Sequence, residues 1–115
     1  MTVNDVYLQA LRYLFEPAGE DADFRREAPG LVSALMYEAL PYENSIRAAR
    51  GEAELESVPE VADMSDEIGM DEGICRIALP FGLAAYYWQD ECDDYKAQDY
   101  RGRFLDALAF LGKAV

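Results

Sequence analysis

The sequence predicts an all-α protein that forms a single domain over residues 1–115, with four main helices. Apolar residues recur in one segment after another with the 3.6-residue period of an amphipathic helix. No segment shows the alternation of apolar and polar residues, bounded by hairpin turns, that is typical of β-strands. The length suits one domain, and 51% hydrophobic residues suffice for a core without disulfides or a structural metal.

The first helix is expected over residues 3–16. Thr2 and Asp5 have the spacing of a capping box, and the segment 17–19, Pro-Ala-Gly, ends the helix. One face of this helix is apolar, and its side chains are Val6, Tyr7, Ala10, Leu11, Leu14 and Phe15. We therefore expect a helix that packs into the core.

The second helix contains prolines. A helical turn or two over residues 24–28 is expected to end at Pro29 and Gly30, and helical spacing then resumes over residues 31–50. Pro41 lies inside this spacing. Because proline removes a backbone hydrogen bond and clashes with the preceding turn, we expect a kink or a break there.

A long acidic connection follows over about residues 51–70. Gly51 is placed as the residue that ends the helix, and the segment contains Pro59 and seven acidic side chains without a sustained period. A short extended piece is expected around residues 58–61. Two interpretations remain open: a loop that meets a neighbouring subunit, or a solvated acidic linker.

The third helix is expected over residues 72–92, capped by Asp71 and bent by Pro80. Gly82 and neighbouring alanines allow another backbone to approach closely. One side of the helix is expected to present Ile74, Ile77, Ala78, Phe81, Ala84, Ala85 and Trp88.

Four acidic side chains crowd the end of this helix. Asp90, Glu91, Asp93 and Asp94 repel one another along a continuing helix, but they suit the start of a new one. We expect Asp93 or Asp94 to cap a last helix. Its buried stripe is predicted to be Tyr95, Tyr100, Phe104, Ala107, Leu108 and Leu111.

The charge of the chain excludes several classes of partner. There are 23 acidic and 10 basic residues and no histidine, so the formal net charge is −13. A chain of this charge repels phosphate backbones and anionic membrane surfaces, so we expect no tight nucleic-acid binding and no membrane. The apolar run over residues 77–88 is too short to span a bilayer, and the first residues do not resemble a signal peptide. We expect an intracellular protein.

Residues with catalytic or metal-binding patterns are scarce. The absence of histidine removes the commonest general base and every zinc site that needs an imidazole. On one helix, Cys75 and Cys92 would lie roughly 25 Å apart, so we expect free thiols in a reducing compartment. The acidic clusters lack the order of a calcium loop. We therefore expect no catalytic residue, no cofactor and no metal, and a protein that is not an enzyme; a small enzyme with paired carboxylates is the weakest alternative.

Three consecutive aromatic residues are the candidate interface. Tyr86, Tyr87 and Trp88 point about 100° apart on a helix, so they cannot all face one core. Tyrosine and tryptophan are enriched at protein interfaces, which makes these residues candidates for a subunit or partner contact. The alternative is that one of the tyrosines covers an edge of its own domain.

The order of segments resembles a known family. An acidic connection (VPEVADMSDEIGMDEG) precedes a helix with a proline-glycine step (IALPFGLAAYYWQDE), an acidic turn and a closing helix (YKAQDYRGRFLDALAFL). This order, together with LVSALMYEALPYENSIRAARG in the first half, resembles the small all-helical head-tail connector, or adaptor, proteins of long-tailed bacteriophages and prophages. The resemblance covers roughly residues 31–111.

The resemblance implies a structural role without catalysis. Copies would form a ring at the portal, extend the channel through which DNA leaves the capsid, and offer a platform to neck or tail proteins. The protein would then be found in the virion, and in the host cytoplasm before assembly. A charge of −13 per subunit would make the lumen of such a ring repel DNA.

Two alternatives of another kind remain. One is an acidic inhibitor that imitates DNA, and the other is a different small protein-interaction module. An imitation of DNA needs carboxylates spaced like phosphates along one exposed face. In this chain the acidic residues gather at helix ends and in loops.

Overall fold

The described part of the chain forms four helices, and a long irregular connection joins the second of them to the third. The computed structural model describes residues 1–14 and 21–113. The helices are α1 (Val3–Leu14), α2 (Ala22–Ala49), α3 (Leu79–Asp90) and α4 (Asp94–Lys113), and a π-helical turn, η2 (Ile74–Ala78), leads directly into α3. The described ranges contain no β-strand and only an isolated bridge between Thr2 and Glu67. The all-α prediction with four main helices is confirmed; the expected end of the first helix, residues 15–19, lies outside the described residues.

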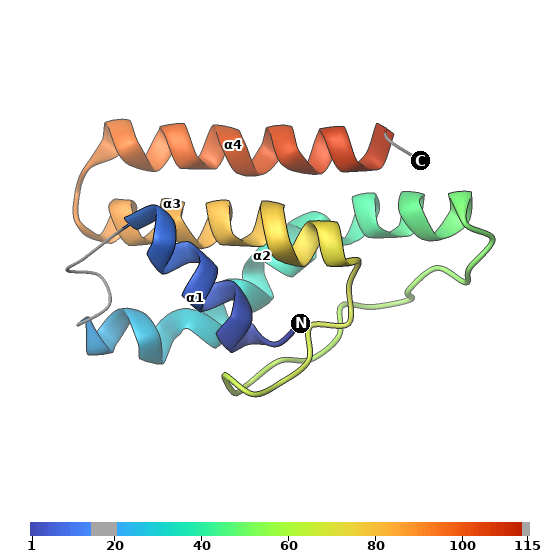
Figure 1. The fold of residues 1–115 in the computed structure, drawn as a ribbon, viewed down its shortest axis with the longest axis horizontal. Coiled ribbons are helices and arrows are strands. Elements are labelled where there is room, and N and C mark those ends of the chain that lie inside the picture. The colour runs from blue at the N-terminus through green and yellow to red at the C-terminus, as the bar shows by residue number, and fades with distance from the viewer. Residues whose placement is uncertain (15–20, 114–115) are drawn as a thin grey trace.

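Helix α3 occupies the centre of the molecule. Helix α4 runs antiparallel to α3 along one side, while α1 and the first part of α2 lie on the other side (Figure 1). Side chains from all four helices meet around α3 and form one buried core. Its largest fully buried apolar members are Tyr7, Phe104, Leu35, Met36, Ile46, Ile68, Ile74, Leu79, Leu83, Leu108 and Val3.

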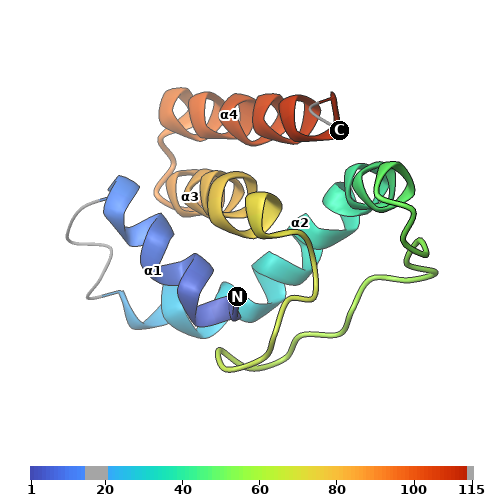
Figure 2. The same cartoon turned by 45° about the vertical axis from the view of Figure 1, so that its right-hand side comes forward.

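The second helix is continuous, so the predicted stop at Pro29 and Gly30 is wrong. Asp21 Oδ1 accepts a hydrogen bond from the Phe24 backbone N–H at 3.0 Å and caps the helix, which runs through both Pro29 and Pro41. The axis changes direction along its length, as expected for a helix with internal prolines (Figures 1 and 2). Tertiary packing explains the continuity, because buried side chains line the helix on both sides of each proline: Phe24, Ala28, Val32, Leu35, Met36, Ala39 and Ile46.

The third helix accommodates Pro80 through the π-helical turn. The Leu79 N–H donates to the Ile74 carbonyl, five residues back, and Pro80 then lies in the first turn of α3. The wider turn removes the clash that the proline ring would make with the carbonyl of Arg76 in an α-helix. The extra residue also rotates the preceding positions, so Ile77, expected to be buried, is 43% exposed.

The third helix ends at Asp90, two residues before the predicted end. The Asp93 N–H donates to the Trp88 carbonyl at 3.0 Å and the Cys92 N–H donates to the Gln89 carbonyl at 3.1 Å. Cys92 has φ +60°, so these bonds form a Schellman motif with cysteine where glycine is usual. This motif, together with repulsion among the acidic side chains, turns the chain into α4.

The predicted helix caps are confirmed. Thr2 and Asp5 form the reciprocal bonds of a capping box, at 2.9 and 3.2 Å. Asp71 Oδ2 accepts from the Gly73 N–H at 2.9 Å, and Asp93 Oδ1 accepts from the Lys96 N–H at 3.1 Å. Gly51 follows α2 with φ +75°. Short-range side-chain hydrogen bonds therefore mark where α1, α4 and the helical segment before α3 begin.

The buried stripe of α4 is confirmed in part. Phe104 and Leu108 are fully buried, and Tyr100, Ala107 and Leu111 are partly buried against the core. Tyr95 is 84% exposed, so its predicted burial is wrong. It lies in the first turn of α4, on the side of the helix opposite Phe104.

The acidic connection is anchored on its own chain. Asn44 forms two side-chain hydrogen bonds with the backbone of Leu55, at 2.8 and 3.1 Å. The first residues of the chain add two backbone hydrogen bonds to the connection. The Val3 N–H donates to the Asp66 carbonyl and the Ile68 N–H donates to the Met1 carbonyl, each at 3.0 Å. Residues 58–61, where a short extended piece was expected, form no β-strand.

A buried carboxylate closes this connection. Glu43, in α2, is 2% exposed and accepts hydrogen bonds from Arg47 Nε and from the Asp71 N–H, both at 2.6 Å. Arg47 donates in turn to the carbonyls of Ala53 and Gly69, each at 3.4 Å. Both ends of the connection are thereby tied to one turn of α2.

Replacement of Gly82 by alanine is expected to lower the free energy of unfolding by about 1–3 kcal/mol. A Cβ atom at this position would lie 2.5 Å from Cδ2 of Leu35 and 3.0 Å from Cδ1 of Phe104, and both of these side chains are fully buried. Gly102→Ala is the matched control, because a Cβ there meets nothing within 4 Å and should stabilise α4 by about 0.5–1 kcal/mol. Urea unfolding measures both; equal effects would contradict the close packing at Gly82.

Glu43→Ala is expected to lower the free energy of unfolding by about 3 kcal/mol, because it removes one partner of a buried, hydrogen-bonded ion pair. The control is Glu72→Ala, which breaks the exposed pair with Arg76 and should change stability by about 0.5 kcal/mol or less. Chemical denaturation compares the two variants. A similar small loss in both would show that Glu43 does not anchor the connection.

Candidate interaction surface

The three aromatic residues of the candidate interface point in different directions. Tyr87 is 6% exposed and packs edge-on against Phe24 and Trp88, with ring centroids 5.1 and 5.2 Å away. Burial, followed by the nearby carboxylate of Glu91, raises the pKa of Tyr87. Trp88 is half-buried beneath Lys96, whose ammonium lies 4.2 Å from the ring centroid. Tyr86 is also half-buried, but it faces an open hollow.

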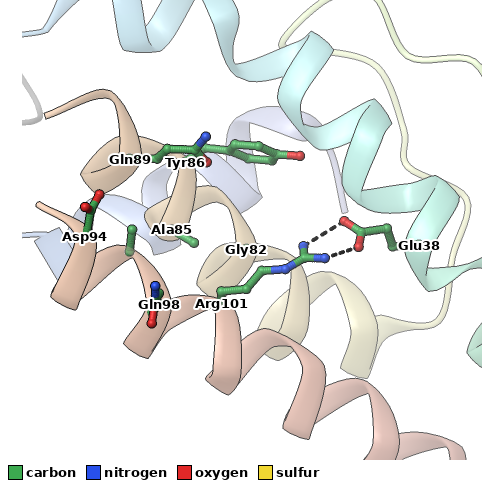
Figure 3. A pocket seen from close by; sticks show the side chains of 9 residues that line it. Glu38, Gly82, Ala85, Tyr86, Gln89, Asp94, Gln98 and Arg101 are labelled. Atoms are coloured by element: carbon green, nitrogen blue, oxygen red, sulfur yellow. Dashed lines mark hydrogen bonds and ion pairs between the residues drawn. The ribbon is translucent and has the colours of Figure 1, made fainter. Parts of the chain in front are cut away.

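Two adjoining hollows meet at Tyr86 and Gln89, and together we call them the Tyr86 groove. The first has a volume of about 440 Å³ and lies between α2, α3 and α4 (Figure 3). Its lining consists of Glu38, Gly82, Ala85, Tyr86, Gln89, Asp94, Ala97, Gln98 and Arg101. The second, of about 570 Å³, lies between the start of α2 and the end of α3, and its lining consists of Asp23, Phe24, Arg26, Glu27, Leu31, Tyr86, Tyr87, Gln89 and Asp90.

Small residues leave room for the first hollow. Where α3 and α4 pack closely, the hollow is lined by Gly82, Ala85 and Ala97. Because these residues have small side chains or none, the surface is recessed at this point. The polar side chains of Gln89 and Gln98 stand beside it in Figure 3. The groove thus combines a shallow apolar floor with a polar rim.

An ion pair between two helices closes one end of the first hollow. Arg101 in α4 donates two hydrogen bonds to the carboxylate of Glu38 in α2, of which the Nη1 bond is 2.8 Å long (Figure 3). The hydrogen bonds from Arg101 hold the pKa of Glu38 below its ordinary value, and the same bonds raise the pKa of Arg101. No local pattern predicts this pair, because the two residues are 63 positions apart in the sequence.

The charges of the groove leave an excess of negative charge. Its two cationic side chains are engaged, Arg101 with Glu38 and Arg26 with Asp23 at 2.6 Å. Asp90 and Asp94 are exposed and form no ion pair within the described part of the chain. The groove therefore offers free carboxylates beside an aromatic ring.

The remaining chemistry-bearing residues lie apart from the groove. Burial raises the pKa of the Cys75 thiol to about 11, while Cys92 is exposed, and both are free thiols. Within residues 1–14 and 21–113, no three His, Cys, Asp or Glu side chains gather as metal ligands would. Nor does any helix of these ranges have the length and apolar character needed to cross a membrane.

Comparisons of the chain with protein families, with curated proteins and with solved structures find no match. The resemblance to head-tail connectors therefore stays a hypothesis that rests on the sequence. The groove presents hydrogen-bonding amides, free carboxylates and one accessible ring.

The pKa of Glu38 provides a direct test of the ion pair. Because its folded-state pKa is lowered, the stabilisation by Arg101 is present above the ordinary value near 4.5 and is lost as the pH falls through the lower folded-state value. A carbon-detected NMR titration should find the Glu38 midpoint below 4.5, and Arg101→Gln should move it upward. Arg103→Gln, whose side chain pairs with Asp99 instead, should leave the midpoint in place. An unshifted midpoint in the unaltered protein would contradict the pair.

Proposed function

We propose that this protein is a non-enzymatic structural component of the head-tail connector type, which assembles with copies of itself at a phage portal and joins head to tail. One observation supports assembly above all others. Helix α4 packs on α3 and α2 with one face, while three large apolar side chains on it remain exposed. These are Tyr95 (84% exposed), Phe110 (71%) and Leu105 (42%).

Exposed aromatic side chains along one helix can anchor a contact with another protein. Aromatic residues are enriched at the centres of protein interfaces, where burial of one phenylalanine contributes about 1.5–3 kcal/mol. Phe110 and Tyr95 lie near opposite ends of α4, so a neighbouring copy could contact the whole length of the helix. The outer face of α4 is accordingly the surface that we assign to self-association.

The distribution of charge suits a conduit for DNA. Four glutamates of the connection, Glu52, Glu54, Glu56 and Glu60, are exposed, and more acidic side chains surround the turn before α4. Repetition of a net charge of −13 around a ring would produce a strongly negative lumen. Such a lumen would let DNA pass without holding it.

Light scattering over a concentration series, with negative-stain images of any large species, tests the proposal. We expect ring-shaped oligomers of the unaltered protein, and a shift to monomers in Phe110→Glu, because a buried charge opposes the apolar contact. Ser57→Glu adds the same charge in the exposed connection and should assemble normally. A monomer at every concentration, or equal assembly of both variants, would contradict self-association through α4.

A further inference from the structure

Four aromatic rings among the described residues have a cation over one face. Arg25 lies over Tyr7, Lys96 over Trp88, Arg103 over Tyr100 and Arg101 over Phe104, at 4.2 to 5.4 Å from the ring centroids. Tyr86 is half-exposed at the junction of the two hollows, and no cation of the described residues lies over its ring. Nor does another aromatic ring of these residues pack against it.

Two carboxylates, unpaired among the described residues, line the groove together with Tyr86 and favour a cationic ligand. Asp90 and Asp94 are exposed without ion-pair partners, and each lines one of the two hollows that Tyr86 joins. The cations that belong to the groove are held by other carboxylates, as described above. A positively charged side chain of a partner would therefore find a ring face and free carboxylates within one surface.

We propose that the Tyr86 groove is a docking surface for an arginine-bearing segment of another protein. A guanidinium group is planar, stacks on aromatic rings and pairs with carboxylates through two parallel hydrogen bonds, whereas an ammonium group is a compact and strongly hydrated charge. The amide groups of Gln89 and Gln98 can bond the backbone of such a segment. Arginine fits this surface better than lysine does.

A second copy of this chain is a poor source of that arginine. Among residues 1–14 and 21–113, seven of the ten Lys and Arg side chains form ion pairs, and Arg12, Arg25 and Lys113 form none with another described residue. Arg25 already lies over Tyr7, and Arg12 donates to Gln9 Oε1 at 3.1 Å. The free carboxylates of the groove attract a basic protein more strongly than a copy with a net charge of −13. The partner is therefore a different, basic protein. The inference rests on the proposed function, because it assigns the surface through which an assembly protein would bind a partner other than its own copies.

Fluorescence anisotropy with two labelled probes, hexa-arginine and hexalysine, tests the inference at about 0.15 M salt. The two peptides carry the same charge, so attraction by net charge alone gives them equal affinity. We expect tighter binding of hexa-arginine by about threefold to tenfold, and loss of this preference in Tyr86→Ala. Tyr86→Leu, which keeps an apolar side chain without the π face, repeats the test should the alanine variant fold poorly. Tyr37→Ala, at an exposed tyrosine of α2 outside the groove, should keep the preference.

A pair of charge-matched double variants locates the site. Asp90→Asn with Asp94→Asn should weaken hexa-arginine binding by about threefold to tenfold, whereas Glu54→Gln with Glu56→Gln removes the same charge from the connection and should weaken it by less than about twofold. Equal weakening by both double variants, a preference that survives Tyr86→Leu, or no binding of either peptide would overturn the inference. Peptide binding needs no ring assembly, so failure to form rings and failure of the groove are separate results.

Discussion

The buried carboxylate of Glu43 holds together parts of the chain that lie far apart in the sequence. It accepts hydrogen bonds from Arg47 in the same helix and from the backbone of Asp71 after the long connection. Because Arg47 also reaches the carbonyls of Ala53 and Gly69, one side-chain pair organises both ends of a segment that lacks regular structure. A buried charge is stable only with such complete pairing, so the connection and the end of α2 depend on each other.

The position of Asp71 has consequences for the rest of the fold. Asp71 caps the start of the third helix, and the π-helical turn that follows lets Pro80 enter α3 without a clash. Helix α3 can then lie at the centre of the molecule, with Gly82 against Leu35 and Phe104. The same close approach of α2, α3 and α4 leaves the first hollow of the Tyr86 groove, whose far end the Glu38–Arg101 pair closes.

The two proposed surfaces differ in physical character, and this difference suits two kinds of partner. The outer face of α4 exposes apolar side chains. Contacts between apolar side chains favour association of identical copies, because such contacts do not bring like charges together. The Tyr86 groove offers carboxylates and one ring, which favour a basic partner. The proposed connector role would use both properties, since it requires binding to copies of the chain and to a different protein.

Local sequence patterns determined the all-α class, the helix caps at Thr2, Asp71 and Asp93, and the acidic character of the chain, because each depends on residues within a few positions of one another. They placed Tyr86, Tyr87 and Trp88 together as interface candidates, but they could not separate the open position of Tyr86 from the buried one of Tyr87. Tertiary structure decided the continuity of α2 through Pro29, where a buried stripe on both sides outweighs the preference of proline to end a helix. It alone decided the bond between Glu43 and the Asp71 backbone and the pair of Glu38 with Arg101, because these partners lie 28 and 63 residues apart and the energy of such contacts depends on burial, which no local pattern encodes.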